Sequence, residues 1–202
     1  MSSLFKVNKK KVLFIHLPRT GGTSMCRSLK LPVLGHQPIT KFKPKPFPFS
    51  LFCKKPFSFA FVRNPWDRVV SIFFLLNGKW TNKKNEADRK TYVEKYNGNF
   101  DNFILESFNG DKPLIFNQQH FKPQYLYVCD EKGDIAVDFI GKYENIQEDF
   151  DKICSKIGLG KIELIRENVS VHKNYREYYN EKTKEIIRRA YQKDIELFGY
   201  EF

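Results

Sequence analysis

The stretch with the clearest capacity for chemistry is FIHLPRTGGTSM, which runs from Phe14 to Met25. An apolar run ends in a Pro-Arg-Thr-Gly-Gly turn, and Thr23 and Ser24 then open a predicted helix. The start of a helix presents unpaired backbone N–H groups and a partial positive charge, and glycines let the backbone wrap closely around an anion. The pattern predicts a phosphate-binding loop with a permanent charge at Arg19; the alternative is an ordinary strand-to-helix turn capped by a threonine.

A second stretch, FAFVRNPWDRVVSIF, has the same strand-to-helix layout between Phe59 and Phe73. Arg63 leaves a predicted strand where a helix begins, with Asn64 as its cap. Ser71 follows Asn64 by seven residues, which places it two turns along the helix on about the same face. An arginine and a serine that converge in this way can bind a second phosphate. The alternative for Arg63 is a surface ion pair, for instance with Asp67.

Together, LPRTGGTS and FVRNPWDRVVS resemble the paired signature of sulfotransferases that use 3′-phosphoadenosine 5′-phosphosulfate (PAPS), and most closely the carbohydrate branch that includes heparan sulfate 2-O-sulfotransferase. The resemblance implies that the first loop holds the 5′-phosphosulfate and that the second motif holds the 3′-phosphate. The implied cofactor-binding residues are Arg19, Thr20, Gly21, Gly22, Thr23, Ser24, Arg63 and Ser71. Arg19 stands where the family usually has lysine, and it keeps the charge in a larger planar group.

The later segments VDFIGKYENIQEDFDKI and YREYYNEKTKEIIRRAYQKDIELFGYEF are similar to the same family, so the resemblance covers most of the chain from Val12 onward. It implies in-line transfer of a sulfuryl group from PAPS to an acceptor hydroxyl, expected on a carbohydrate, with release of 3′-phosphoadenosine 5′-phosphate (PAP). Arg19 would neutralise charge that develops at the bridging oxygen. The transferred group carries less charge than a phosphoryl group, so no metal is required.

Transfer to a hydroxyl requires a general base, and the sequence offers four histidines. His36 lies in LGHQPI between the two phosphate motifs, where the carbohydrate branch has a Gly-His pair that supplies the catalytic base. The resemblance therefore implies that His36 is the base, and the alternative is a loop histidine that lines the substrate entrance. His120 is the second candidate and could instead bind the acceptor. His16 is expected to be structural, and His172 to lie in a solvated loop or beside the 3′-phosphate.

The net charge of +12 favours anionic partners, and an acidic glycan is one of them. The net charge and the loop motif, taken alone, are also compatible with two other classes of function. One is a small kinase on a P-loop-type fold, although here Gly22 is followed by Thr23 rather than by the Lys-Ser/Thr of that motif. The other is a non-catalytic nucleic-acid-binding module, although no RNA- or DNA-binding motif is recognised, so no nucleic acid is expected as a partner.

Alternating strand and helix patterns must position these motifs. Strands are predicted at 12–17, 57–62, 125–128 and 135–140, with a turn at 130–134, and helices at 23–29, 64–77, 99–108, 145–157 and 180–198. Residues 33–56 and 79–124 contain the loops expected to form the acceptor site. The pattern predicts an α/β fold: a single P-loop-like domain over residues 1–202, with a mainly parallel central sheet flanked by helices.

The remaining features concern the compartment and the chain ends. The four cysteines, Cys26, Cys53, Cys129 and Cys154, form no CxxC pair and no zinc spacing, which predicts free thiols and no metal site. Residues 1–11 are expected to be a flexible basic N-terminus without a signal-peptide core. No apolar run approaches the ~20 residues of a membrane span. The expected location is therefore cytoplasmic.

Overall fold

A computed structural model describes residues 4–33, 35–42, 55–78, 83–110, 113–165 and 172–202. The chain forms two compact units, each built from two stretches of sequence. Unit 1 comprises Met1–Arg63 and Gln124–Asn168, and unit 2 comprises Asn64–Pro123 and Val169–Phe202. The sheet therefore belongs to unit 1, and unit 2 opens at the cap of the helix that follows Arg63.

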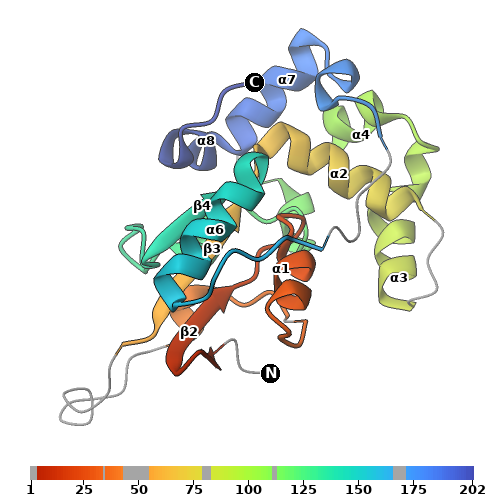
Figure 1. The fold of residues 1–202 in the computed structure, drawn as a ribbon. Helices are drawn as coiled ribbons and strands as arrows, with labels where there is room; N and C mark the ends of the chain where they lie inside the picture. The colour runs from red at the N-terminus through yellow and green to blue at the C-terminus, as the bar shows by residue number, and fades with distance from the viewer. Residues whose placement is uncertain (1–3, 34, 43–54, 79–82, 111–112, 166–171) are drawn as a thin grey trace. The chain divides into compact units, whose positions relative to one another are not determined.

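Unit 1 is an α/β structure around a four-stranded sheet in the order β1-β2-β3-β4 (Figure 1). Its strands are β1 (Leu4–Val7), β2 (Lys10–Ile15), β3 (Phe57–Val62) and β4 (Phe139–Lys142). β1 pairs with β2 antiparallel, whereas β2–β3 and β3–β4 are parallel. The predicted mainly parallel sheet is confirmed. Because β2 and β3 are parallel, the segments that follow them, including His16 and Arg63, leave the same edge of the sheet.

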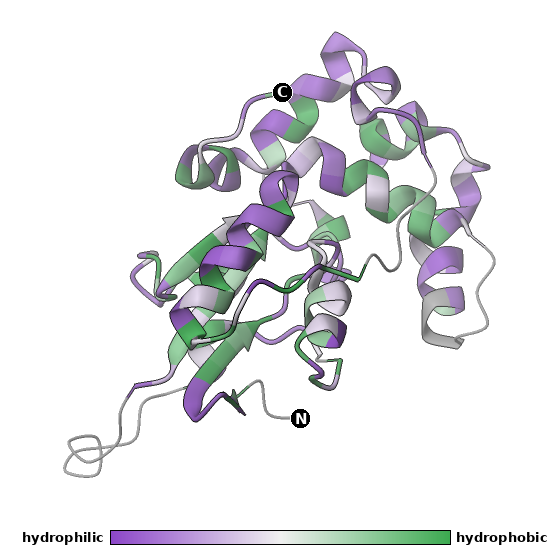
Figure 2. Ribbon diagram, in the orientation of Figure 1, coloured by the Kyte–Doolittle hydropathy of each residue, from purple (hydrophilic) through white to green (hydrophobic). Residues whose placement is uncertain are grey.

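Two helices cover one face of this sheet, α1 (Gly22–Ser28) and α6 (Ile146–Ile157). Phe14 and Phe59 from the strands form one buried cluster with Met25 of α1 and Phe150 of α6. The intervening strand residues, such as Ile15 and Ala60, are also fully buried. Strands buried on both faces read as continuous apolar runs, which appear green along β2 and β3 in Figure 2.

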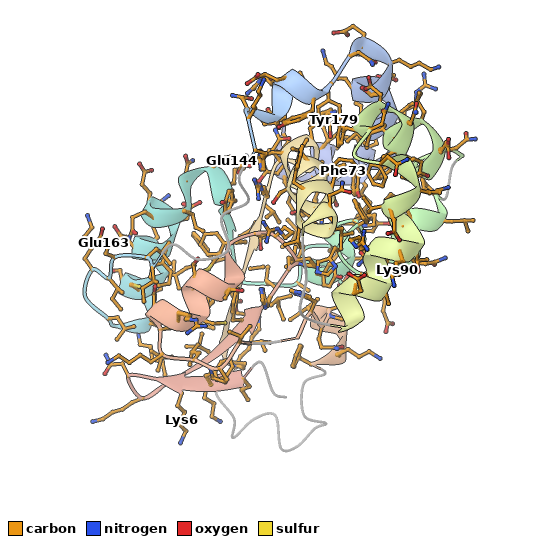
Figure 3. The ribbon with its side chains drawn as sticks, turned by 90° about the vertical axis from the view of Figure 1, so that its right-hand side faces the viewer. Lys6, Phe73, Lys90, Glu144, Glu163 and Tyr179 are labelled. Carbon is orange, nitrogen blue, oxygen red and sulfur yellow. The ribbon has the colours of Figure 1, made fainter. Side chains whose placement is uncertain are left out.

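The first residues that the structure describes form a β-hairpin in place of the expected flexible N-terminus. β1 and β2 are joined by Asn8 and Lys9, with φ angles of 45° and 65°. Two consecutive left-handed residues form the turn that matches the twist of a hairpin. Asn-Lys is a weaker signal for such a turn than Asn-Gly. The lysines at 6 and 9–11 made this segment read as a solvated terminus, so β1 and the first residues of β2 were not predicted. Lys6 extends from this hairpin in Figure 3.

Unit 2 is helical. Its α-helices are α2 (Pro65–Asn77), α3 (Lys83–Tyr92), α4 (Phe100–Ser107), α7 (Glu181–Ala190) and α8 (Gln192–Phe198). Asn64 caps α2 as predicted, because its side chain accepts a hydrogen bond from the backbone N–H of Trp66. Phe73, labelled in Figure 3, packs against Phe100 and Phe103 with ring centroids 5.2 and 5.0 Å apart. Aromatic rings thus form much of this core.

Two predicted elements were wrong. Residues 125–128, predicted as a strand, form the short helix α5 (Tyr125–Val128). Of the predicted strand at 135–140, only its end joins the sheet as part of β4, and Ile135 makes an isolated bridge to Cys129. A four-residue apolar run does not distinguish a helix from a strand. The predicted turn at 130–134 is confirmed, since the Asp130 carboxylate accepts hydrogen bonds from the N–H groups of Lys132 and Asp134.

The predicted C-terminal helix is divided in two at Tyr191. α7 begins with a capping box between Asn180 and Thr183, and Tyr191 lies between α7 and α8 with φ −114° and ψ 24°. The hydroxyl of Tyr191 donates to the backbone oxygen of Phe121 at 2.6 Å. The burial of the Tyr191 ring and its hydrogen bond to Phe121 favour a break in the helix at this residue. The apolar periodicity of the sequence gives no sign of that break. The short 3-10 helices are η1 (Ile39–Lys41), η2 (Glu94–Tyr96), η3 (Leu114–Asn117), η4 (Tyr143–Asn145) and η5 (Tyr175–Tyr178).

Three further predictions concern metals, thiols and membranes. Within the described part of the chain, no group of His, Cys, Asp and Glu side chains is placed to hold a metal ion. Cys26, Cys129 and Cys154 are buried free thiols, and Cys53 lies outside the described residues. Residues 43–54 of the predicted acceptor loop 33–56 also lie outside them. None of the helices in the described ranges has the length and apolar character needed to cross a membrane.

Candidate active site

The loop between β2 and α1 combines two left-handed residues with an internal hydrogen bond. Arg19 has φ 64° and Gly21 has φ 79°. The hydroxyl of Thr20, which is fully buried, donates to the backbone oxygen of Leu17 at 3.1 Å. A hydroxyl has one proton, so the Thr20 side chain stabilises the loop, and its backbone N–H is the group left to meet an anion. The left-handed Arg19 is a strained position for a side-chain-bearing residue.

The left-handed φ of Gly21 and the surroundings of both loop glycines disfavour a side chain. A Cβ atom on Gly21 would lie 2.3 Å from Cδ1 of Ile146, and one on Gly22 would lie 2.0 Å from Cδ2 of His16. Neither distance is sterically possible without movement. The start of α1 has no side-chain cap and no acidic residue in its first turn. Its backbone N–H groups, together with the hydroxyls of the half-buried Thr23 and the buried Ser24, form a donor set that suits an anion.

His36 lies directly against this loop. Its Nδ1 atom is 2.9 Å from the backbone oxygen of His16, and the two imidazole rings meet edge to face with centroids 4.4 Å apart. A carbonyl oxygen only accepts hydrogen bonds, so Nδ1 of His36 carries the proton. In the neutral ring, Nε2 of His36 then holds the lone pair that can accept a proton. His36 is half-buried, whereas His16 is buried, with its ring against Gly22.

Arg63 joins the second motif to the loop. Its Nη1 atom donates to the backbone oxygen of Arg19 at 3.2 Å, and its side chain is buried at 5% exposure. The guanidinium carbon lies 4.2 Å from the centroid of the Tyr143 ring. The sequence suggested a surface ion pair as the alternative role for Arg63, and burial excludes a surface position. The guanidinium of Arg63 therefore supplies positive charge at this edge of the sheet.

Two residues of this site escaped prediction, Gln124 and Tyr143. The side-chain amide of Gln124, fully buried, accepts from the backbone N–H of Arg63 and donates to its backbone oxygen, both at 2.8 Å. Gln124 comes just before residues 125–128, which were predicted as a strand, and nothing in that prediction gave Gln124 a role in the site. Tyr143 lies in a segment whose resemblance was interpreted only as support for the fold.

The other predicted residues belong to unit 2. Ser71 is fully buried in α2, so its pairing with Arg63 at one phosphate stays a prediction. His172 packs on Phe74 with ring centroids 5.8 Å apart, and its Nδ1 lies 2.7 Å from the backbone oxygen of Lys173. These contacts give His172 a packing role within its own unit.

His120, also in unit 2, has the opposite tautomer from His36. The side-chain oxygen of Gln118 accepts from the backbone N–H of His120 at 2.5 Å, which fixes the orientation of that amide. The amide nitrogen of Gln118 therefore faces both Nδ1 of His120, at 2.7 Å, and a carboxylate oxygen of Asp88, at 3.1 Å. An amide nitrogen only donates, so Nδ1 of His120 accepts and Nε2 carries the proton. This arrangement suits a hydrogen-bond donor better than a base.

Unit 1 thus brings together the loop 19–24, His16, His36, Arg63, Gln124 and Tyr143 at one edge of a parallel sheet. A glycine-containing turn at a helix start, with a histidine of fixed tautomer beside it, forms a candidate site for an anion.

Comparison with known proteins identifies the group of enzymes. The chain matches the family model described as "Sulfotransferase family" over residues 3–201. An uncharacterized protein of Archaeoglobus fulgidus is 32% identical over 118 residues, which cover 58% of this chain and 81% of that protein. The protein belongs to the sulfotransferase family, whose members are transferases that generally take the sulfuryl group from PAPS.

Proposed function

We propose that this protein transfers a sulfuryl group from PAPS to a hydroxyl group of an acceptor, with a carbohydrate as the expected class of acceptor. The observation that carries the proposal is the 3.2 Å hydrogen bond from Arg63 to the backbone oxygen of Arg19. It joins Arg63, the residue of the second motif that lies in unit 1, to the loop of the first motif in the same unit. Two phosphate-binding groups side by side match a nucleotide that carries phosphates on both its 3′ and 5′ positions.

The residues of the loop fit the 5′ end of such a cofactor. The uncapped first turn of α1 supplies backbone donors, and Gly21 and Gly22 permit the close packing of the loop that substitution would prevent. Arg19, Thr23 and Ser24 add a charge and two hydroxyls. The loop has no lysine after its second glycine, which supports a P-loop-like site for a single phosphate rather than for a triphosphate.

PAPS, when bound, supplies a sulfuryl group whose bond to the 5′-phosphate breaks as the acceptor oxygen bonds to sulfur. Nε2 of His36 accepts the proton of the acceptor hydroxyl, since Nδ1 is held protonated by the backbone oxygen of His16. Arg19 stabilises negative charge on the phosphate side. Arg63, with Ser71, binds the 3′-phosphate, and the guanidinium keeps further donors after its bond to the Arg19 carbonyl.

Calorimetric titration with PAP, 5′-AMP, ATP and a single-stranded oligonucleotide tests this function. We expect PAP to bind more tightly than 5′-AMP, with Arg63→Ala removing most of that difference, on the order of 2 kcal/mol for a charge-assisted contact. Equal affinity for PAP and 5′-AMP would refute the assignment. Preference for ATP supports the kinase alternative, and binding of only the oligonucleotide supports the nucleic-acid module.

Transfer from labelled PAPS to a panel of glycans, lipids, phenols and tyrosine peptides identifies the acceptor class. We expect sulfated glycan product, with anionic glycans favoured by the net charge of +12. Transfer confined to phenols or peptides would refute the carbohydrate part of the proposal and retain the sulfotransferase part.

A further inference from the structure

Tyr143 touches both motifs of the proposed cofactor site. Its ring faces the guanidinium of Arg63, with the carbon of that group 4.2 Å from the ring centroid. The same ring lies beside Gly21, since a Cβ built there would be 3.4 and 3.5 Å from its Cδ2 and Cε2 atoms. One side chain therefore contacts the arginine assigned to the 3′-phosphate and lies beside the loop 19–24, which is called the transfer loop below.

The position of this ring is fixed by the segment that carries it. Tyr143 opens η4, between β4 and α6. The carboxylate of Asp149, which is buried in the first turn of α6, accepts from the backbone N–H of Lys142 at 2.8 Å. Ile146, at the start of α6, contacts Gly21 alongside Tyr143. The ring is thus anchored to the sheet on one side and to a helix on the other.

Arg63 depends on that ring for its orientation. Gln124 holds the backbone N–H and backbone oxygen of Arg63 with two hydrogen bonds of 2.8 Å. The side chain still has four rotatable torsions, and the face of Tyr143 and the backbone oxygen of Arg19 are among the contacts that limit them. A cation over an aromatic face is stabilised by roughly 0.5–2 kcal/mol, which suffices to favour one arrangement of the guanidinium.

From these contacts we infer that Tyr143 is a positioning residue that couples recognition of the 3′-phosphate to the shape of the transfer loop. The inference rests on the proposed function. Tyr143 holds the Arg63 guanidinium where it binds the 3′-phosphate and the carbonyl of Arg19 together. Loss of the ring releases Arg63 from both partners, so discrimination for the 3′-phosphate and turnover fall together.

The test compares Tyr143→Leu and Tyr143→Met with Tyr143→Phe. Titration with PAP and with 5′-AMP gives the affinity ratio of each variant without any need for turnover. We expect the ratio to fall about 10-fold in the Leu and Met variants, the scale of a lost cation–π contact, and to stay within about twofold in the Phe variant, which keeps the ring face. With PAPS and acceptor, the first two variants are expected to lower kcat as well as to raise KM.

A double variant tests the coupling itself. Arg63→Ala combined with Tyr143→Leu is expected to lose no more of the PAP preference than Arg63→Ala alone, because residues that act through one contact are not additive. Tyr96→Leu is the matched control: the Tyr96 ring belongs to the core of unit 2, and its centroid lies 4.7 Å from the ammonium of the exposed Lys95. It is expected to lower the unfolding temperature while leaving the affinity ratio unchanged.

The outcomes separate this inference from the proposed function. If the wild type prefers PAP and the Leu and Met variants retain that preference, the positioning role is wrong and the proposed function stands. Equal losses in Tyr143→Phe and Tyr143→Leu, or additive losses in the double variant, also overturn the positioning role. A wild type that binds PAP and 5′-AMP equally overturns the proposed function and this inference with it.

Discussion

The Nδ1 atom of His36 lies 2.9 Å from the backbone oxygen of His16, the first residue after β2. This hydrogen bond joins a loop residue 20 positions later in the chain to the start of the turn between β2 and α1, and it fixes the proton on Nδ1. His120 has the reverse arrangement, with Nδ1 accepting from Gln118. The two candidate bases are therefore distinguishable by chemistry and by mutation.

Replacement of His36 is expected to remove the base and leave the cofactor site intact. His36→Ala should lower kcat by ~100-fold or more, the usual scale for a lost general base, with little change in PAP affinity. His36→Asn is the sharper variant, because its amide nitrogen can still donate to the backbone oxygen of His16 although it cannot accept a proton. Steady-state kinetics and PAP titration of both variants give the measurement.

The control for this prediction is His120→Ala, and the pH profile is a second readout. Loss of the acidic limb of the rate profile in His36→Asn identifies His36 as the titrating base. A near-wild-type rate in His36→Asn, combined with loss of turnover in His120→Ala, would assign the base to His120. The sulfotransferase family membership would be unaffected by that result.

Alanine at Gly22 is expected to distort the turn between β2 and α1, the proposed binding site for the 5′ end of the cofactor. The new Cβ would meet the His16 ring at 2.0 Å, and overpacking of this kind costs roughly 1–3 kcal/mol. Gly22 opens α1, where alanine would otherwise be favoured by helix propensity, so a loss of stability is attributable to the contact. Thermal unfolding should show a lower midpoint, and titration should show weaker binding of PAP.

Gly160→Ala is the matched control for Gly22→Ala. It lies in the same unit, and a Cβ there would meet nothing within 4 Å. We expect its unfolding midpoint and PAP affinity to match those of the wild type. Wild-type stability and PAP affinity in Gly22→Ala would show that the loop tolerates a side chain at this position. The close approach of His16 to Gly22 would then not be needed for binding.

Sequence alone predicted the elements that carry strong local signals. The strand 57–62 and the helix capped by Asn64 have their predicted bounds because an apolar run, an N-cap and a proline at the first helical position all agree. The resemblance assigned the loop 19–24 and Arg63 to two ends of one cofactor. In the structure Arg63 lies next to the loop, because its guanidinium donates to the backbone oxygen of Arg19.

The unpredicted features depend on contacts between residues far apart in the chain. Gln124 binds the backbone of a residue 61 positions earlier, and Tyr143 lies beside Gly21 because β4 pairs with β3. No local periodicity encodes such contacts. The break at Tyr191 likewise depends on a hydrogen bond to Phe121, 70 residues away. Tertiary contacts override helix propensity in this case.

Transfer is expected to persist in EDTA. The proposed donor lacks a triphosphate, and the charge near the loop comes from Arg19 and Arg63. Sulfuryl transfer from labelled PAPS, assayed with and without EDTA, should give the same rate within about twofold, since arginine side chains and backbone donors neutralise the developing charge. A complete loss of activity that magnesium restores would favour the kinase alternative.

Asp138 gives unit 1 a pH-dependent contribution to stability. Burial raises the pKa of this carboxyl, but hydrogen bonds from the Ser58 hydroxyl, the Lys55 ammonium and the Ser58 backbone N–H outweigh that effect, so its pKa lies below the usual value. The bonds to the Ser58 hydroxyl and backbone N–H measure 2.6 and 2.8 Å. They join the segment before β4 to the start of β3. The ionised carboxylate therefore stabilises the folded state.

The direction in which stability changes with pH follows from the lowered pKa of Asp138. The contribution is complete above the unfolded pKa of about 3.9 and is lost as the pH falls through the lower folded value. Asp138→Asn should lower the free energy of unfolding by ~1 kcal/mol at pH 7, and the difference from wild type should narrow below pH 4. Lys55→Met should cost less, because the Lys55 side chain is 73% exposed and surface ion pairs contribute little. Urea unfolding at pH 7 and pH 3 measures the free energy of unfolding of both variants. If Asp138→Asn differs from the wild type by the same free energy at the two pH values, the carboxylate charge contributes nothing.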